Sequence, residues 1–160
     1  MFLMYNHEII PPQRLGMKLF LFFTLFSLSL FGAHIDEFAQ NMGYERDYAK
    51  ALAEAKKENK PLMLVVVGDT CPWCRKFERK TLSQQRIAFE VAQHFVPLII
   101  DRKHDEGTYP PLYNAPRIPT VYFIDPKEEK YFYESMGYVK LEDYASLLEE
   151  LKTTFAKEHK

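Results

Sequence analysis

The chain has 160 residues, of which 47% are hydrophobic and 27% are charged, and its formal net charge is −1. This composition is typical of one globular domain with a core of its own. Because the charge is close to neutral and the sequence has no basic patch interleaved with aromatic residues, a nucleic-acid partner is not expected.

An apolar segment near the N-terminus predicts a targeting signal rather than a part of the fold. Residues 19–31 are thirteen residues without a charge, preceded by Met17-Lys18 and followed by Gly32-Ala33. This length suits the apolar region of a secretory signal peptide and is short for a transmembrane helix. We therefore expect a Sec-type signal peptide and an exported, periplasmic-type location.

Residues 1–16 do not look like the start of a signal peptide, so translation is expected to begin at Met17. Cleavage after Ala33 would leave bulky Phe31 where a small residue is preferred, so retention as an N-terminal membrane anchor is the alternative to cleavage. On this interpretation, residues 1–33 are an N-terminal extension plus signal peptide, and residues 34–160 are the folded domain.

Residues 44–59 are expected to form a helix. Tyr48, Leu52 and Ala55 recur at i, i+4 and i+7, which gives the helix one apolar side. Asn59-Lys60-Pro61 then predicts the end of the helix, because proline cannot continue it.

A strand and a cysteine motif follow. Residues 62–67 are all apolar and half of them are β-branched, which indicates a strand buried on both faces. After Gly68-Asp69-Thr70 comes Cys71-Pro72-Trp73-Cys74, and the charged residues 75–80 favour a helix. Pro72 fits the first turn of a helix, where its missing N–H costs nothing. Both cysteines are therefore expected where a central strand ends and a helix begins.

This position predicts reactive sulfur chemistry. The first N–H groups of a helix have no partner within the helix, and the peptide dipoles favour negative charge there, so a thiolate at Cys71 would be stabilised. Arg75 and Lys76, one turn further on, are expected to add to the effect. Such sites lower the pKa of a cysteine from ~8.5 to roughly 3.5–7.5. Cys74 lies about one turn away, so we expect an exposed, attacking Cys71 and a more buried, resolving Cys74.

Two less reactive interpretations compete with this one. A zinc site would need two more soft ligands, and the chain has only these two cysteines, while His94 and His104 offer no paired spacing. A structural disulfide is the other alternative for an exported chain. Closing so short a loop constrains the unfolded chain little, however, so a redox centre explains the motif better.

The next segment predicts a helix and a second strand. Ser83 is expected to cap a helix whose buried stripe is formed by Ile87, Val91 and Phe95. Residues 95–101 form the expected strand. A strand, helices and a strand in sequence imply a parallel pair with a right-handed crossover.

The last third of the chain predicts the remaining elements. The connection at residues 102–117 is polar and proline-rich, with room for a short helix near 108–113. Residues 120–124 and 130–136 are expected to be antiparallel strands joined by a turn. Residues 141–155 are expected to be a closing amphipathic helix. Its inward residues are Tyr144, Leu147, Leu148 and Leu151.

Aromatic residues gather on the last two strands: Tyr122, Phe123, Tyr131, Phe132 and Tyr133. A ligand-binding cluster is one interpretation. Alternating strand residues that pack beneath helices explain the pattern better, so these aromatic residues are expected in the core.

Two motifs together resemble the thioredoxin superfamily. Cys71-Pro72-Trp73-Cys74 follows a buried strand, and Ile118-Pro119-Thr120, which begins 44 positions beyond Cys74, precedes another. The similarity runs from about residue 44 to residue 152, and Lys60-Pro61-Leu62 resembles the branch of small exported thioredoxin-like proteins. The resemblance implies an α/β thioredoxin fold, with a mixed sheet of four or five strands flanked by helices.

The resemblance also implies a substrate-binding role for three residues. In this family the proline that matches Pro119 is cis and lies against the active-site disulfide. It would aim the Ile118 backbone at a substrate chain, which pairs with it like a strand. Trp73 would be an exposed contact for substrates beside Cys71. The alternatives are an ordinary trans turn at Pro119 and a packing role for Trp73.

The implied function is that of an exported thiol–disulfide oxidoreductase that needs no cofactor and no metal. Cys71 and Cys74 would alternate between dithiol and disulfide through a mixed disulfide with the substrate. Ile118 favours a reductant, because the family's oxidants often have Val or Thr before the cis-proline. The implied partners are proteins with disulfides, such as misformed disulfides or apocytochrome c, and a membrane-embedded thiol protein as electron donor. A monomer is expected.

Some features depart from thioredoxin. The pair between the cysteines is Pro-Trp rather than Gly-Pro, and the acid that thioredoxin buries six residues before the first cysteine is Val65 here. Asp69 is a candidate substitute, although its position suits a solvated turn former. The alternatives in function are a disulfide oxidase or isomerase of the same fold, or a non-catalytic binding module built on it.

Overall fold

The computed structural model describes residues 34–159. The expected signal segment, its cleavage site and the start at Met17 all lie outside these residues. Among the residues described, no helix is both long enough and apolar enough to cross a membrane.

The centre of the fold is a mixed four-stranded sheet in the order β2-β1-β3-β4. β1 (Leu62–Val67) is buried at every position. It pairs in parallel with β2 (Val96–Asp101) and antiparallel with β3 (Thr120–Asp125). β4 (Lys130–Met136) pairs antiparallel with β3 and forms one edge. The four predicted strands and the parallel and antiparallel pairings are thereby confirmed.

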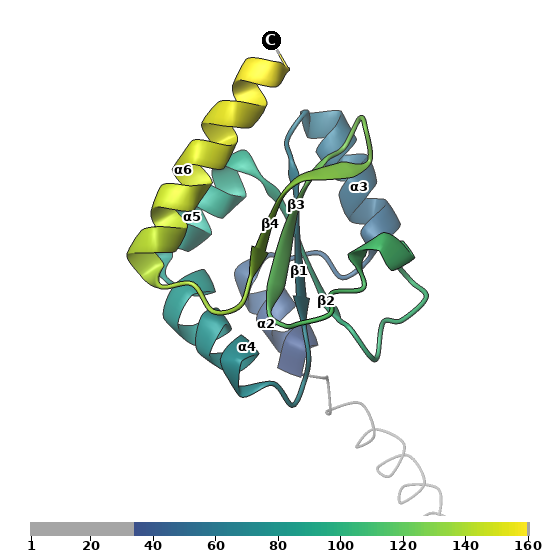
Figure 1. Cartoon of the computed structure of the whole chain (residues 1–160), viewed down its shortest axis with the longest axis vertical. Helices are drawn as coiled ribbons and strands as arrows, with labels where there is room; N and C mark the ends of the chain where they lie inside the picture. Colours follow the sequence, from purple (N-terminus) through teal and green to yellow (C-terminus); the bar gives the residue numbers. More distant parts are fainter. Residues whose placement is uncertain (1–33, 160) are drawn as a thin grey trace, which may run out of the picture. The chain divides into compact units, whose positions relative to one another are not determined.

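Helices cover both faces of the sheet (Figure 1). One face packs against α2 (His34–Met42), α4 (Pro72–Phe77), α5 (Gln85–His94) and α6 (Leu141–Glu158). The other face packs against α3 (Tyr48–Glu58) and the short 3₁₀ turn η3 (Pro111–Tyr113). Alternate β1 side chains enter the two cores, which explains why the whole strand is apolar.

The helix expected at residues 44–59 is shorter than predicted, and another helix, α2, precedes it. α3 begins at Tyr48, because the side chain of Asp47 accepts the Lys50 N–H at 2.8 Å and caps it. Glu45 instead makes a single parallel bridge to Leu98, so within residues 34–159 the sheet has four strands rather than five. The preceding helix α2 was not predicted, although it buries an apolar stripe that includes Ile35 and Phe38.

Ser83 does not cap a helix, contrary to prediction. α4 continues into a π-helical turn, η2 (Glu78–Leu82), and the Ser83 N–H donates to the Glu78 carbonyl at 2.8 Å. Ser83 therefore ends one helical segment, and α5 begins after Gln84 without a side-chain cap. The predicted burial of Ile87, Val91 and Phe95 is confirmed.

The aromatic residues of the last two strands do not all lie in the core. Tyr122 and Phe123 are buried as expected, but Tyr131 and Tyr133 are 41% and 40% exposed. Their strand, β4, is an edge strand, so less of its surface is covered than in β3. In α6, Tyr144, Leu148 and Leu151 are buried, whereas Leu147 is only partly buried.

Candidate active site

The loop after β1 presents the two cysteines at the start of α4. The Cys71 N–H donates to the Gly68 carbonyl at 3.0 Å, which closes the turn. Cys71 is the N-cap of α4, and Pro72 occupies the first turn, as predicted. The Cys74 N–H donates to Cys71 Sγ at 3.1 Å. The sulfur thus accepts a hydrogen bond from the otherwise unpartnered end of a helix, where negative charge is favoured.

Cys71 and Cys74 form a disulfide, with their Cα atoms 5.2 Å apart. Cys71 is partly exposed, while Cys74 is fully buried in the core that includes Phe77. An incoming sulfur therefore has access to Cys71 rather than to Cys74. The arrangement can open and close this bond, with Cys71 as the accessible atom.

The loop before β3 lies beside the sulfur of Cys71. The Ile118–Pro119 peptide bond is cis, and the Ile118 carbonyl oxygen lies 3.9 Å from Cys71 Sγ. The Ile118 side chain covers Gly68 so closely that a Cβ at that position would lie 2.8 Å from Ile118 Cδ1. A larger residue at position 68 would therefore force the terminal methyl of Ile118 to shift.

Trp73 is 57% exposed and lies beside an aromatic partner on the loop before α6. Its ring centroid is 6.1 Å from that of Tyr138, and Lys76 Nζ lies over both rings, at 4.7 Å from Trp73 and 4.5 Å from Tyr138. The ammonium group is attracted to the faces of the two rings. Lys76 therefore contacts these rings rather than the cysteines.

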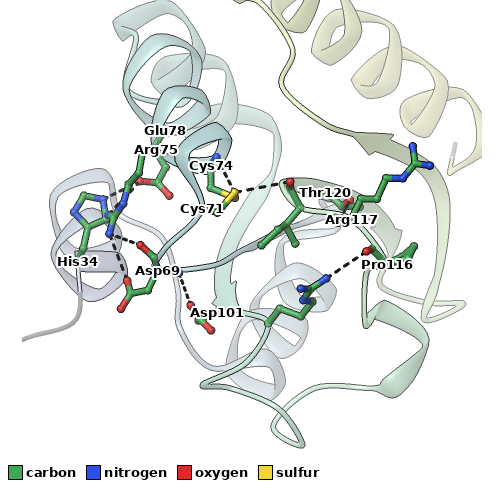
Figure 2. The surroundings of a disulfide bond; sticks show 12 residues. His34, Asp69, Cys71, Cys74, Arg75, Glu78, Asp101, Pro116, Arg117 and Thr120 are labelled. Atoms are coloured by element: carbon green, nitrogen blue, oxygen red, sulfur yellow. Dashed lines mark hydrogen bonds and ion pairs between the residues drawn. A yellow bond between two sulfur atoms is a disulfide. The ribbon is translucent and has the colours of Figure 1, made fainter.

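Arg75 is also engaged away from the sulfurs, contrary to its expected role. Its guanidinium donates to the Asp69 carbonyl at 2.9 Å and pairs with the carboxylates of Asp69 and Glu78 at 3.6 and 3.8 Å. Figure 2 shows Arg75 between His34, Asp69 and Glu78. The stabilisation of a Cys71 thiolate thus depends first on the helix end, not on a direct ion pair.

The buried acid near the cysteines is Glu78, which the sequence analysis did not single out. Val65 is fully buried in the middle of the sheet, and Asp69 is only partly buried. Glu78 is 3% exposed, and its carboxylate lies 2.8 Å from His34 Nε2. Burial raises the pKa of Glu78, although Arg75 opposes this shift. Its spacing of one helical turn from Cys74 was the available signal.

Asp101, at the end of β2, holds the neighbouring loop in place. Its carboxylate accepts the backbone N–H groups of Asp69, Lys103 and His104, each at 2.8 Å. Burial alone would raise the pKa of Asp101, but these three hydrogen bonds outweigh burial and lower it. The ionised carboxylate thereby joins the loop after β2 to the loop that carries Cys71.

A groove of about 470 Å³ opens beside the disulfide. It is lined by Trp73, Ile118 and Pro119, and also by Arg117, Met136, Gly137 and Tyr138. All five predicted site residues, including both cysteines, therefore lie around one site. The sequence analysis missed Arg117 in the loop before β3, Met136 at the end of β4 and Tyr138 in the loop after it.

A zinc site was the alternative interpretation of the cysteines. Within residues 34–159, no three or more His, Cys, Asp or Glu side chains are grouped so that they could hold a metal ion. His94 pairs with Glu90 at 3.7 Å, and the two cysteines are bonded to each other.

A protein-family model described as thioredoxin-like matches residues 43–126. A segment of 54 residues is 37% identical to spermatogenesis-associated protein 20 from Rattus norvegicus and covers 34% of this chain. The human protein of the same name is 35% identical over a segment of the same length. The match spans only 7% of either relative.

Solved structures share the fold. A thioredoxin from Thermus thermophilus has a TM-score of 0.59 at 22% identity, covering 68% of this chain and 85% of that one. A structure described as DsbH oxidoreductase has a TM-score of 0.57 at 23% identity, covering 68% and 83%. The oxidised C-terminal domain of DsbD from Neisseria meningitidis has a TM-score of 0.55 at 21% identity, covering 67% and 97%. The expected thioredoxin fold is thereby confirmed.

Proposed function

This chain belongs to the thioredoxin-like family, and from that premise we propose that it is an exported thiol–disulfide oxidoreductase that works mainly as a reductant. The observation that carries the proposal is the accessible Cys71 sulfur, which accepts the Cys74 N–H at the start of α4 and is joined to a buried Cys74. A family fold alone would not imply activity, but this sulfur geometry is what thiol exchange needs.

The reaction begins with the reduced pair. The Cys71 thiolate attacks one sulfur of a substrate disulfide, a mixed disulfide forms, and the other substrate sulfur leaves as a thiolate that takes up a proton. Cys74 then loses its proton and attacks Cys71 Sγ. The Cys71–Cys74 bond forms, the second substrate thiol is released, and two electrons have moved to the substrate.

The Ile118 loop would position the substrate during this exchange. The Ile118 carbonyl lies 3.9 Å from Cys71 Sγ, so an extended segment hydrogen-bonded to that backbone would have its own sulfur near Cys71. The second round requires a reductant that returns two electrons to the disulfide. We propose a membrane-embedded thiol protein as that donor, in keeping with an exported chain.

Trapping tests the enzymatic role. In Cys74→Ser the resolving thiol is absent, so mixed disulfides on Cys71 should accumulate in cells and yield substrate proteins by mass spectrometry after reduction. Cys71→Ser is the matched control and should trap none. Equal recovery of partners with both variants would favour the alternative, a non-catalytic binding module that uses the same fold.

The direction of electron flow is tested by the reduction potential of the Cys71–Cys74 pair. Ile118 before the cis-proline is the feature that favours a reductant. Equilibration with a dithiol buffer of known potential should give a two-electron transition nearer to ~−270 mV than to ~−120 mV. A reduction potential near ~−120 mV would instead identify an oxidase.

A further inference from the structure

The groove beside the disulfide has an apolar wall that the cysteine chemistry does not use. Trp73 and Met136 are 57% and 54% exposed, and they line the groove together with Tyr138. Lys76 over the Trp73 and Tyr138 rings keeps the two rings together. Exposed apolar side chains that gather in one hollow usually mark a contact surface for another molecule.

Two basic side chains, those of Arg117 and Lys76, lie next to this apolar wall. Arg117 lines the groove, and among residues 34–159 its side chain has no ion pair or hydrogen bond. Lys76 likewise has no carboxylate partner within the part of the chain that the structure describes. Both positive charges are therefore available to a molecule that enters the groove.

A lysine lies on the other side of Ile118. A second hollow of about 260 Å³ is lined by Ile118 and by Lys103 and His104 of the loop after β2. The acids that line it have partners: Asp69 pairs with Arg75, and Asp101 accepts three backbone N–H groups. The hollow thus carries both signs, and its exposed cation without a carboxylate partner among residues 34–159 is Lys103, while the Trp73 side of Ile118 is apolar with Arg117 beside it.

We propose that this surface selects protein segments in which the reacting cysteine has an apolar neighbour and is flanked by acidic residues. The apolar neighbour lies against Trp73 and Met136, while the acidic side chains reach Arg117 on one side and Lys103 on the other. This inference rests on the proposed function and names the substrate class for the same site. Charge complementarity of this kind raises the rate of productive encounter.

The test compares two synthetic peptides, each carrying one cysteine as a mixed disulfide with 2-mercaptoethanol. Both have Leu next to the cysteine, and they differ only in flanking Glu or flanking Lys residues. The reduced full-length chain is mixed with each peptide and the released peptide thiol is measured. Each rate is divided by the rate with dithiothreitol, which removes the peptide's own reactivity. The acidic peptide should react about tenfold faster or more at low ionic strength.

Salt and charge variants identify the source of the preference. The ratio of the rate with the acidic peptide to the rate with the basic peptide should fall as the salt concentration rises from about 0.02 M to about 0.5 M, because salt screens exposed charges. Arg117→Glu should lower or invert the ratio of the two rates, and Arg117→Lys should retain it. Lys57→Glu, an equal charge change on the exposed surface of α3, is the control and should leave the ratio unchanged.

Equal normalised rates for the two peptides, or a ratio unaltered by Arg117→Glu, would overturn the inference. Bis(2-hydroxyethyl) disulfide, which is small and uncharged, separates this result from a failure of the proposed function. If the wild-type chain reduces it but shows no charge preference, only the substrate class is wrong. If the chain reduces neither this disulfide nor the peptides, the proposed function fails and the substrate class fails with it.

Discussion

At the scale of single residues, Cys71 acts in the fold as serine or aspartate does in an ordinary helix cap. Its side chain accepts the N–H of the residue three positions on, at 3.1 Å. The same contact that caps α4 would also stabilise a thiolate when the disulfide is reduced. The sequence predicts this role because proline at the first helical position and the preceding buried strand fix where α4 begins.

The residue that the sequence did not identify is Glu78. Acidic residues in a charged stretch usually face water, and only the spacing of one helical turn from Cys74 distinguishes Glu78 within the stretch from Arg75 to Lys80. The fold buries Glu78 because the apolar face of α4 continues into the π-helical turn. His34, from a helix that the sequence analysis did not predict, then meets the carboxylate at 2.8 Å.

Glu78 predicts a specific dependence of stability on pH. Because burial raises the pKa of Glu78, the folded chain binds this proton more tightly than the unfolded chain does. Its contribution to stability is present in full below the unfolded pKa of ~4.3 and is lost as pH rises through the folded pKa. Stability measured by urea unfolding should therefore rise in Glu78→Gln relative to wild type as pH increases from about 4 to about 7.

Glu150→Gln is the control for this measurement, because Glu150 lies on the exposed side of α6. It should leave the difference from wild type nearly constant across the same pH range. A Glu78→Gln difference that stays flat, or that falls with rising pH, would contradict the effect of burial on Glu78.

Among the helices and strands, long apolar or periodic segments were predictable, but the boundaries and turns between them were not. β1 and α6 have strong patterns and appear where the sequence places them. The π-helical turn depends on tertiary packing: Phe77, just before it, is fully buried, with its ring perpendicular to that of Tyr144 on α6. Sequence alone gives no sign of that contact, so Ser83 looked like a cap.

The edge strand shows a second limit of the sequence pattern. Tyr131 and Tyr133 alternate like core residues, but alternation does not reveal whether a layer covers the strand. That depends on the strand order, which puts β4 at the border of the sheet. The sequence therefore predicted the strand correctly and the burial of its aromatic side chains incorrectly.

At the scale of the whole molecule, strand order is what assembles the site. β1 and β3 are antiparallel neighbours with Val66 opposite Thr120, so the end of β1 meets the start of β3. This register brings the loop of Cys71 to the loop of Ile118 and Pro119 across 47 positions of sequence. Hydrophobic patterns do not determine which strands become neighbours, so only the resemblance to a known family predicted this meeting.

The position of Cys71 at the start of α4 should make its thiol acidic. The chain has only two cysteines, so Cys74→Ser leaves Cys71 as its one thiol. The most direct measurement is the rate at which iodoacetamide alkylates this variant as a function of pH. We predict an inflection well below the ordinary ~8.5, within roughly 3.5–7.5, whereas an inflection at or above ~8.5 would show that the start of α4 does not acidify Cys71.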